Sequence, residues 1–365
     1  MKIVIFGLTI SSSWGNGHAT LWRGLSKALA RQGHRVVFFE RDVPYYAGAR
    51  DLYEVPGGKL IFYQDWEGIW PQACGEARDA DVVIVTSYCP DGIAAAELIG
   101  SCAPGLRVFY DLDTPVTLAR LSSGGSVPYI GPQGLGDFDL VLSYTGGQAL
   151  TLLREKLGAR RVAPLYGHVD PDVHQPVRPQ GHYRADLSYL GTYSADRQPS
   201  VEALFLDPAR QRPELRFLIG GAQYPQEFPW CSNIHFVRHL PPSEHPAFFS
   251  SSRLTLNVTR AAMAQMGWCP SGRLFEAAAC ATPVLSDNWD GLDTFFTPGD
   301  DILVATNEAD APAALDLSDA ELARIGRAAR ERVLAAHTSE VRAGELIDAL
   351  EAAHSHVAAP ELVEA

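Results

Sequence analysis

The sequence predicts an α/β protein built from two tandem Rossmann-like domains, and three observations support this fold class. The chain has 365 residues, more than a single hydrophobic core usually serves. Short β-branched runs alternate with amphipathic helical stretches in both halves, as in parallel sheets covered by helices on both faces. The alternation lapses around residues 166–185, where Pro, Gly and His are abundant and an interdomain linker is expected.

The first half is expected to form one doubly wound domain, residues 1–170. An amphipathic helix is predicted at 20–33, with Leu21, Leu25 and Leu29 on one face and Gly33 at its end. The strands predicted in this half are 2–8, 35–40, 59–63, 81–87, 106–113 and 138–145.

The second half repeats the pattern and is expected to form a second Rossmann-like domain, residues 171–340. Its predicted strands are 186–192, 214–221, 234–240, 253–259, 282–287 and 301–306. Its predicted helices are 200–210, 272–281, 318–336 and 339–355. Residues 341–365 are then a C-terminal helix and tail that could pack back on the N-terminal domain.

Composition excludes several classes of partner. A net charge of −13 argues against non-specific binding to nucleic acid or to anionic membranes. The sequence contains no stretch of about 18 apolar residues, which a membrane span needs. Its six cysteines form no Cys-x-x-Cys pair, and no histidines cluster at metal-ligand spacing. We therefore expect a reduced, cytoplasmic protein without a metal.

The loop after the first predicted strand carries a candidate base. Ligands of open parallel sheets bind at the carboxyl ends of the strands. There, Gly15 and Gly17 precede His18, whose near-neutral pKa would suit proton abstraction from a hydroxyl, although a plain glycine-rich turn is the alternative. Trp14 and Asn16 are candidate sugar or acceptor contacts. The Gly-x-Gly-x-x-Gly fingerprint of dinucleotide sites is not met, since its third glycine is replaced by a threonine.

Two carboxylates close the fifth predicted strand. Asp111 and Asp113 flank Leu112, and Pro115 forces a break in the chain. Such a pair could bind the hydroxyls of a sugar or act as a base. Asp before Pro is equally common turn chemistry, so both interpretations stand.

Loops of the second domain offer groups for a phosphate. Gly191 would allow a close backbone approach, while Thr192 and Arg197 could contact the anion. Gly221 repeats the pattern of glycine directly after a strand. The alternative for Arg197 is an ordinary surface charge.

The strongest candidate is the start of the helix predicted at 272–281. Ser271 is expected as its N-cap, and Arg273 adds a guanidinium at the positive end of the helix dipole, which is an anion site. Glu276, one turn further, could accept hydrogen bonds from two vicinal hydroxyls of a ribose. The alternative is an Arg–Glu pair on a solvated face. Downstream, Asp290 and Gly291 could contact sugar hydroxyls, or simply form a loop.

At this helix the sequence resembles the GT-B glycosyltransferases, whose second domain has a helix of the form FEAAACGTPV before a strand. More narrowly it resembles the bacterial spore-maturation, CgeB-like glycosyltransferases. The resemblance extends over about residues 1–305 and rests on the phrases YDLDTPVTLARL, LSYTGG, LGARRVAPLYGHVDP, DLSYLGTYSADRQP, HLPPSEHPAF, LNVTRAAM and SGRLFEAAACATPVLSDNWDGLD.

The resemblance implies two Rossmann-like domains facing each other across a cleft, with the acceptor on the first and the nucleotide-sugar donor on the second. It implies metal-independent chemistry, in which the helix dipole and Arg side chains stabilise the leaving diphosphate. Glu276 matches the ribose-binding Glu, Ser271 and Arg273 match the phosphate end, and Arg260 is a further diphosphate candidate. His18 stands where many inverting members keep a base. Trp268 occupies the position where many retaining relatives have a second Glu.

The leading functional hypothesis is therefore transfer of a sugar from a nucleoside-diphosphate donor, UDP- or dTDP-linked, to a hydroxyl acceptor, with no other cofactor. His18 or Asp113 would be the base. One alternative is an epimerase or hydrolase acting on nucleotide sugars, and another is a binding protein without catalysis. An NAD-dependent oxidoreductase is a distant further alternative, kept open by Glu40 at the end of the second strand.

Overall fold

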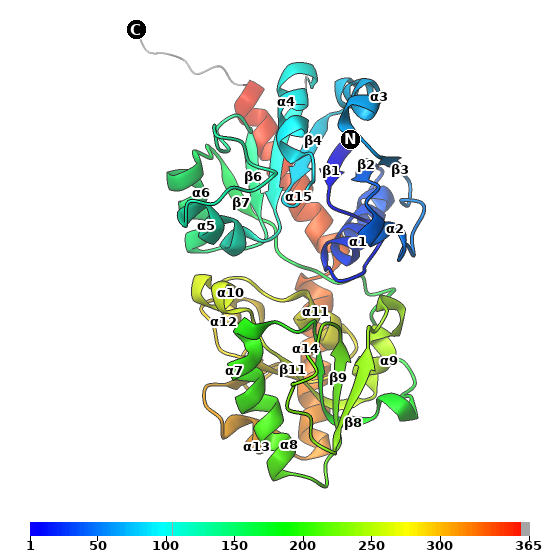
Figure 1. Ribbon diagram of the computed structural model, residues 1–365, viewed down its shortest axis with the longest axis vertical. Coiled ribbons are helices and arrows are strands. Elements are labelled where there is room, and N and C mark those ends of the chain that lie inside the picture. The colour runs from blue at the N-terminus through cyan, green and yellow to red at the C-terminus, as the bar shows by residue number, and fades with distance from the viewer. Residues whose placement is uncertain (104, 359–365) are drawn as a thin grey trace. The chain divides into compact units, whose positions relative to one another are not determined.

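The computed structural model describes residues 1–103 and 105–358, which form two compact units (Figure 1). The N-terminal unit comprises Met1–Tyr166 together with the segment that begins at Ser339, and the C-terminal unit comprises Gly167–Thr338. No helix among the described residues is both long enough and apolar enough to cross a membrane.

Within the described residues, the N-terminal unit is built on a seven-stranded parallel sheet of order β3-β2-β1-β4-β5-β6-β7. The order reverses between β1 and β4, and ligands of open α/β sheets bind at the carboxyl ends of the strands at such a point. The strands are β1 Lys2–Gly7, β2 Arg35–Arg41, β3 Lys59–Tyr63, β4 Val82–Thr86, β5 Leu106–Asp111, β6 Leu140–Ser143 and β7 Val162–Pro164.

Helices cover both faces of this sheet (Figure 1). Val4 and Phe6 of β1 belong to the core beneath α3 and α4, while Ile3 and Ile5 belong to the core beneath α1 and α15. This alternation explains why β1 is a continuous apolar run. The helices are α1 His18–Arg31, α2 Pro44–Ala47, α3 Trp66–Arg78, α4 Gly92–Cys102, α5 Thr114–Ser122, α6 Gln148–Leu157 and α15 Ser339–Ala358.

The C-terminal unit has a six-stranded parallel sheet in the part of the chain that is described, of order β10-β9-β8-β11-β12-β13. Its order reverses between β8 and β11, so the loops after these strands are where a ligand is expected. The strands are β8 Ala185–Leu190, β9 Phe217–Gly221, β10 Ile234–Arg238, β11 Ser252–Asn257, β12 Val284–Asp287 and β13 Leu303–Ala305.

Short helices at the strand ends and one long helix complete this unit. The α-helices are α7 Gln198–Val201, α8 Asp207–Gln211, α9 His245–Ser250, α10 Ala261–Met266, α11 Gly272–Ala279, α12 Leu292–Phe295, α13 Asp310–Leu315 and α14 Asp319–Ala336. A π-helical turn, Glu202–Leu206, joins α7 to α8. Short 3-10 helices lie at Gly181–Tyr183, Ala195–Arg197 and Pro242–Glu244.

The predicted fold class is confirmed: the chain forms two α/β units with parallel sheets. The fifth predicted strand is shorter than expected, because β5 ends at Asp111 and Asp113 is already the residue before α5. Strand β7 was not predicted, since it has three residues, is only partly buried and ends in Pro164.

Candidate functional site

Two glycines bring the loops after β8 and β9 together in the C-terminal unit. The Gly191 N–H donates to the Gly220 carbonyl over 2.8 Å. A side chain at Gly221, whose φ is +156°, would collide with the Gly191 carbonyl oxygen. A Cβ at Gly191 would lie 2.5 Å from Nη1 of Arg273. A side chain at Gly191 would therefore displace the Arg273 guanidinium, while contact of this backbone with a phosphate stays a prediction.

Arg273 and Arg197 are neighbouring cations at the end of β8. Arg273 donates through Nη1 to the Leu190 carbonyl and through Nε to Ser271 Oγ over 3.2 Å. Arg197, 8% exposed, donates through Nη2 to the Thr192 carbonyl over 2.6 Å. Burial and the charge of Arg273 lower the pKa of the Arg197 guanidinium. Two guanidiniums held by backbone carbonyls are suited to a bound anion.

Neither arginine forms an ion pair with any carboxylate of the described residues, and Nε of Arg197 has no hydrogen-bond partner there. The alternative that Arg197 is a surface charge is wrong, because its side chain is buried. The alternative of a solvated Arg–Glu pair is wrong as well, because Glu276 is buried and directed elsewhere.

Ser271 occupies the N-cap position of α11 but makes no side-chain capping bond to the first turn. Ser271 is thus the N-cap residue, as predicted, but its Oγ accepts the Nε–H of Arg273 instead of a backbone N–H of the first turn. The backbone at Ser271 is extended, with φ −66° and ψ 138°, as an N-cap requires. The Leu274 N–H donates to the Ser271 carbonyl over 3.0 Å. The amides of Gly272 and Arg273 are left for another acceptor, at the positive end of the helix dipole.

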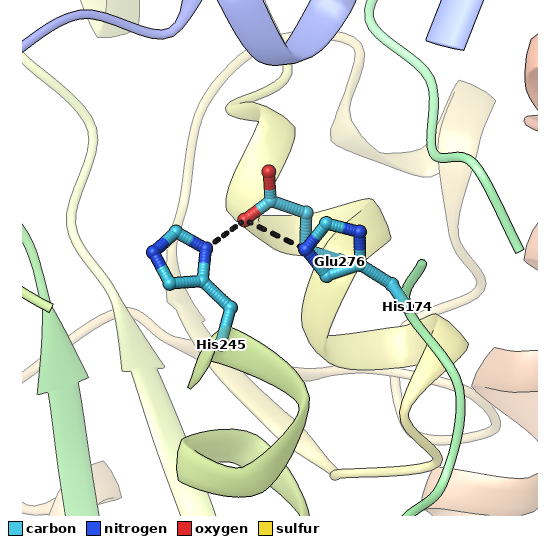
Figure 2. Close-up of side chains that lie close together, drawn as sticks. All are labelled: His174, His245 and Glu276. Carbon is cyan, nitrogen blue, oxygen red and sulfur yellow. Dashed lines mark ion pairs between the residues drawn. The ribbon is translucent and has the colours of Figure 1, made fainter. Parts of the chain in front are cut away.

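Glu276, on the next turn of α11, faces two histidines (Figure 2). Its Oε2 lies 3.4 Å from Nδ1 of His245 and 3.9 Å from Nε2 of His174. Its second carboxylate oxygen points away from both rings in Figure 2. Burial favours the neutral acid, but His174, His245 and Arg273 bring the pKa of the Glu276 carboxyl down to about 2. Burial also lowers the pKa of His174.

The remaining donor candidates lie on the loops around this edge. Arg260 precedes α10, and its Nε is 3.7 Å from Oδ2 of Asp196. Gly291 begins α12 with φ +88°, and a Cβ there would lie 2.5 Å from the Trp268 ring. Asp290 has an exposed side chain, and its carbonyl accepts the Trp268 N–H over 2.6 Å.

His18 and Asp113 form a pair in the N-terminal unit. His18 is the first residue of α1, Asp113 directly precedes α5, and Nε2 of His18 lies 3.0 Å from Oδ2 of Asp113. Because an ionised carboxylate only accepts, this contact selects the tautomer with the proton on Nε2. Nδ1, which has no hydrogen-bond partner in the described chain, then keeps its lone pair. The ring of Tyr88 packs edge-on at 5.6 Å.

Asp111 holds the backbone of Asp113 in place by a hydrogen bond. Its side chain is fully buried, and Oδ1 accepts from the Asp113 N–H and from Thr117 Oγ1, each over 3.1 Å. Burial raises the pKa of its carboxyl to about 6. Asp111 therefore shapes the turn that presents Asp113, as the turn-chemistry interpretation predicts.

The glycine-rich loop before α1 is held internally. Asn16 donates to the carbonyls of Ser12 and Trp14, each over 3.2 Å, and accepts from the Ala19 N–H over 3.2 Å. Trp14 is partly exposed.

The carboxylate of Glu40 is fully buried and occupied by the loop after β1. It accepts from the Thr9 hydroxyl over 2.9 Å and from the Ile10 N–H over 2.8 Å. It also accepts from both the amide and the hydroxyl of Ser11. Glu40 thus has no oxygen free for a dinucleotide ribose, and the oxidoreductase alternative loses the residue that kept it open.

Comparisons with solved structures cover almost the whole chain. Sucrose-phosphate synthase from Thermosynechococcus elongatus is 17% identical, with a TM-score of 0.68 over 96% of this chain and 99% of that one. Anabaena HepE in complex with UDP-glucose is 13% identical, with a TM-score of 0.66 over 96% and 100%. A glycosyltransferase from Rickettsia africae is 10% identical, with a TM-score of 0.65 over 97% and 98%. The chain has the GT-B fold.

The comparison with sequence families covers a smaller part of the chain than the structural comparisons do. Residues 197–348 match the family model described as "Glycosyl transferase-like". This match includes α11 with Arg273 and Glu276, and ends within α15. No curated protein matches the chain by sequence.

The GT-B fold brings together residues that the sequence could not connect. His174 and His245 were not predicted as site residues, because they lie far from Glu276 in the sequence and on unrelated segments. Tyr189, whose ring lies 5.9 Å below the Arg273 guanidinium, was also missed. Asp287, which accepts from both the amide and hydroxyl of Thr259, was missed as well. Asp287 ends β12, and its place at a strand's carboxyl end could have identified it.

Proposed function

We propose that the protein transfers a sugar from a nucleoside-diphosphate donor, UDP- or dTDP-linked, to a hydroxyl acceptor. The observation that carries this proposal is the pair Arg197 and Arg273, without carboxylate partners among the described residues, beside the N-terminus of α11. The glycosyl transferase-like match of residues 197–348 supports it. The choice of UDP as the nucleotide rests on analogy with structures such as HepE, which was solved with UDP and with UDP-glucose.

In this proposal the C-terminal unit holds the donor. Arg273, Arg197 and the first-turn amides of α11 bind the diphosphate, and Glu276 accepts hydrogen bonds from the ribose hydroxyls. Ser271 positions Arg273 through its hydroxyl. Additional donor contacts are proposed for Gly191, Thr192, Gly221 and Arg260, and sugar contacts for Asp290 and Gly291.

The transfer step uses a base from the N-terminal unit. Nδ1 of His18 takes the proton of the acceptor hydroxyl, and Asp113 stabilises the imidazolium that forms. The acceptor oxygen forms a bond to the anomeric carbon, and the bond from that carbon to the diphosphate breaks. The diphosphate leaves with the electron pair, stabilised by the arginines and the helix dipole rather than by a metal ion.

Two further assignments belong to this proposal. Trp14 and Asn16 are proposed to contact the acceptor. The chain is proposed to be a CgeB-like glycosyltransferase.

Calorimetric titration with UDP, dTDP, GDP and CMP, in EDTA, tests the donor site. One nucleotide should bind wild-type protein, and Arg273→Ala should weaken it about 10- to 100-fold, since charge-assisted hydrogen bonds are worth about 1.5–3 kcal/mol. Arg212→Ala is the matched control, because Arg212 only pairs with Glu214 and Asp316 at the surface. The proposal fails if no nucleotide binds, or if Arg273→Ala binds as wild type does.

Turnover distinguishes transfer from the alternatives. With a hydroxyl acceptor panel, the proposal expects nucleoside diphosphate and glycosylated acceptor in equal amounts, with EDTA present. Free sugar or an epimerised donor would instead identify a hydrolase or an epimerase. Tight donor binding without turnover on any acceptor would identify a binding protein.

A further inference from the structure

Three side chains with metal-ligating atoms converge inside the C-terminal unit. His174 Nε2 or Nδ1, His245 Nδ1 and a Glu276 carboxylate oxygen can be chosen so that all lie within 4.8 Å of one another. They come from three separate segments: the loop before β8, the first residue of α9, and the middle of α11 (Figure 2). Figure 2 shows both rings directed at the same carboxylate oxygen, Oε2.

His174 is buried and His245 is partly buried, and both lack hydrogen bonds that imidazoles in such surroundings normally have. His174 is 1% exposed, and neither of its ring nitrogens makes a hydrogen bond within residues 1–103 and 105–358. Nδ1 of His245 also lacks such a bond in that part of the chain. An unsatisfied buried polar group is costly, so nitrogens in this state indicate a missing ligand.

We propose that His174, His245 and Glu276 bind a divalent transition-metal ion of the Zn²⁺ class. Two imidazoles with one carboxylate are a ligand set that Zn²⁺ and its neighbours prefer. Mg²⁺ and Ca²⁺ prefer oxygen ligands alone and would not select this set. The sequence-based expectation of no metal rested on the spacing of histidines along the chain, which does not reveal a cluster assembled by folding.

All three ligand atoms lie within 4.8 Å of one another, and the two distances from Glu276 Oε2 come close to those around such an ion. Zn–N and Zn–O bonds of about 2.0–2.2 Å place the ligands of a tetrahedral ion about 3.3–3.5 Å apart. The distance of 3.4 Å between Oε2 and His245 Nδ1 already matches this value. The distance of 3.9 Å from Oε2 to His174 Nε2 requires the side chains to approach by about half an ångström. Three protein ligands leave the fourth position of the ion open.

Such an ion would connect segments that are distant in the chain. It would tie the loop carrying His174 to α9 and α11, and so stabilise the folded C-terminal unit against unfolding. It would also engage Oε2 of Glu276, which leaves the second carboxylate oxygen for the proposed ribose contact. The metal site itself does not depend on that contact, because it is defined by the three side chains alone.

Cobalt titration of metal-free, full-length protein tests the site. Co²⁺ replaces Zn²⁺ in such sites and reports histidine ligation through its visible absorption. We expect one equivalent to bind, and Zn²⁺ but not excess Mg²⁺ to displace it. The substitutions His174→Gln, His245→Gln and Glu276→Gln should each weaken binding at least 100-fold. His235→Gln is the matched control, because His235 is an exposed histidine on β10 of the same unit.

Thermal unfolding gives the second measurement. Zn²⁺ should raise the Tm of wild type and of His235→Gln, and should leave the Tm of the three ligand variants unchanged. Circular dichroism of the metal-free variants establishes that they are folded. The proposal is overturned if Co²⁺ gives no histidine-ligated spectrum, or if the ligand variants bind it as tightly as wild type. Because these titrations contain no nucleotide and the donor titrations contain EDTA, either proposal can fail without the other.

Discussion

Asp111 and Asp113 are two positions apart but have opposite surroundings. Asp111 is fully buried, and its burial raises the pKa of its carboxyl to about 6. Asp113 is partly exposed and contacts His18. The end of the strand separates them: β5 ends at Asp111, whose carboxylate is buried, and Asp113 lies in the turn before α5, where it contacts the candidate base. Their contributions to stability and activity should therefore separate on substitution.

Asp111→Asn should change the pH dependence of stability. Since burial raises the pKa from 3.8 to about 6, the folded protein binds more protons than the unfolded chain in that window. The raised pKa stabilises the fold fully below pH 3.8, and this stability is lost as pH rises through about 6. Asparagine does not titrate, so the variant does not lose stability in this way. The free energy of unfolding of Asp111→Asn, minus that of wild type, should therefore rise by about 2–3 kcal/mol between pH 4 and 7.

Urea denaturation at both pH values measures this difference. Asp137→Asn, at an exposed position of the same unit, is the control and should show no such change. An equal stability difference between Asp111→Asn and wild type at the two pH values would contradict the assignment.

His18→Ala should lower kcat about 10²- to 10⁴-fold, the usual contribution of a general base, while leaving nucleotide affinity unchanged. Asp113→Asn should give a smaller loss, because it acts through the ring it contacts. Steady-state kinetics with saturating donor measures both effects. His354→Ala, at an exposed position on α15, serves as the control. Unchanged turnover in His18→Ala would remove this residue from the mechanism.

At this scale, sequence reasoning located the groups that follow local rules. Arg273 and Glu276 were found because a helix start and its next turn are visible in the sequence, and His18 because a helix begins there. It did not find His174 and His245, since their relation to Glu276 exists only in three dimensions. It placed Ser271 correctly as the N-cap of α11, but not the hydrogen bond by which the Ser271 hydroxyl accepts from Arg273.

At the level of elements, helix α14 packs against α11 through a glycine. A Cβ at Gly326 would collide with the carbonyl oxygen of Ala281, two residues after the end of α11, and would lie 3.2 Å from Pro283. The helix that carries the candidate phosphate and ribose residues is therefore held at a separation that only glycine permits.

Gly326→Ala should destabilise the C-terminal unit by about 1–3 kcal/mol, the usual cost of overpacking a tight contact. Gly344→Ala, the same change on α15, has nothing within 4 Å and should stabilise by about 0.5–1 kcal/mol through helix propensity. Denaturant unfolding of both variants tests the contrast. If the two substitutions changed the free energy of unfolding equally, or if Gly326→Ala stabilised the protein, α14 would be shown to move aside.

Elements were predicted best where burial is continuous. The strands β1, β2 and β4 are almost wholly buried apolar runs, and their positions matched the prediction within a residue or two. The helix predicted at 200–210 instead includes a π-helical turn at Glu202–Leu206, just before Pro208. Proline has no N–H to donate to the preceding turn, and this local defect does not appear in a hydrophobic pattern.

For the whole molecule, the N-terminal unit is completed by the last helix of the chain. Ala343, Leu346 and Leu350 of α15 lie in the same core as Leu21 and Leu25 of α1. The C-terminal unit, in contrast, is one continuous segment, Gly167–Thr338. Two domains could be predicted from length and alternation, and the C-terminal helix was expected to pack back on the N-terminal domain. The residues that it covers could not be predicted, because the core partners of α15 are far from it in sequence.

Because of this arrangement, fragments that correspond to the two units should differ in whether they fold on their own. Residues 167–338 alone should unfold cooperatively and bind the nucleotide selected by the full chain. Residues 1–166 alone should not fold cooperatively, because the apolar face of α1 lacks its cover. Fusing residues 339–358 to them through a flexible linker should restore a cooperative transition. Circular dichroism with urea measures each case, and cooperative unfolding of residues 1–166 alone would contradict the role of α15.

The order of completion during synthesis follows from the position of α15. During translation, residues 1–166 of the N-terminal unit are synthesised first. The core between α1 and α15 cannot form until α15 has emerged from the ribosome. The C-terminal unit has all its residues earlier and can fold while translation continues. The part of the protein made first is thus the part finished last, and it is the nascent N-terminal unit that would need protection by chaperones.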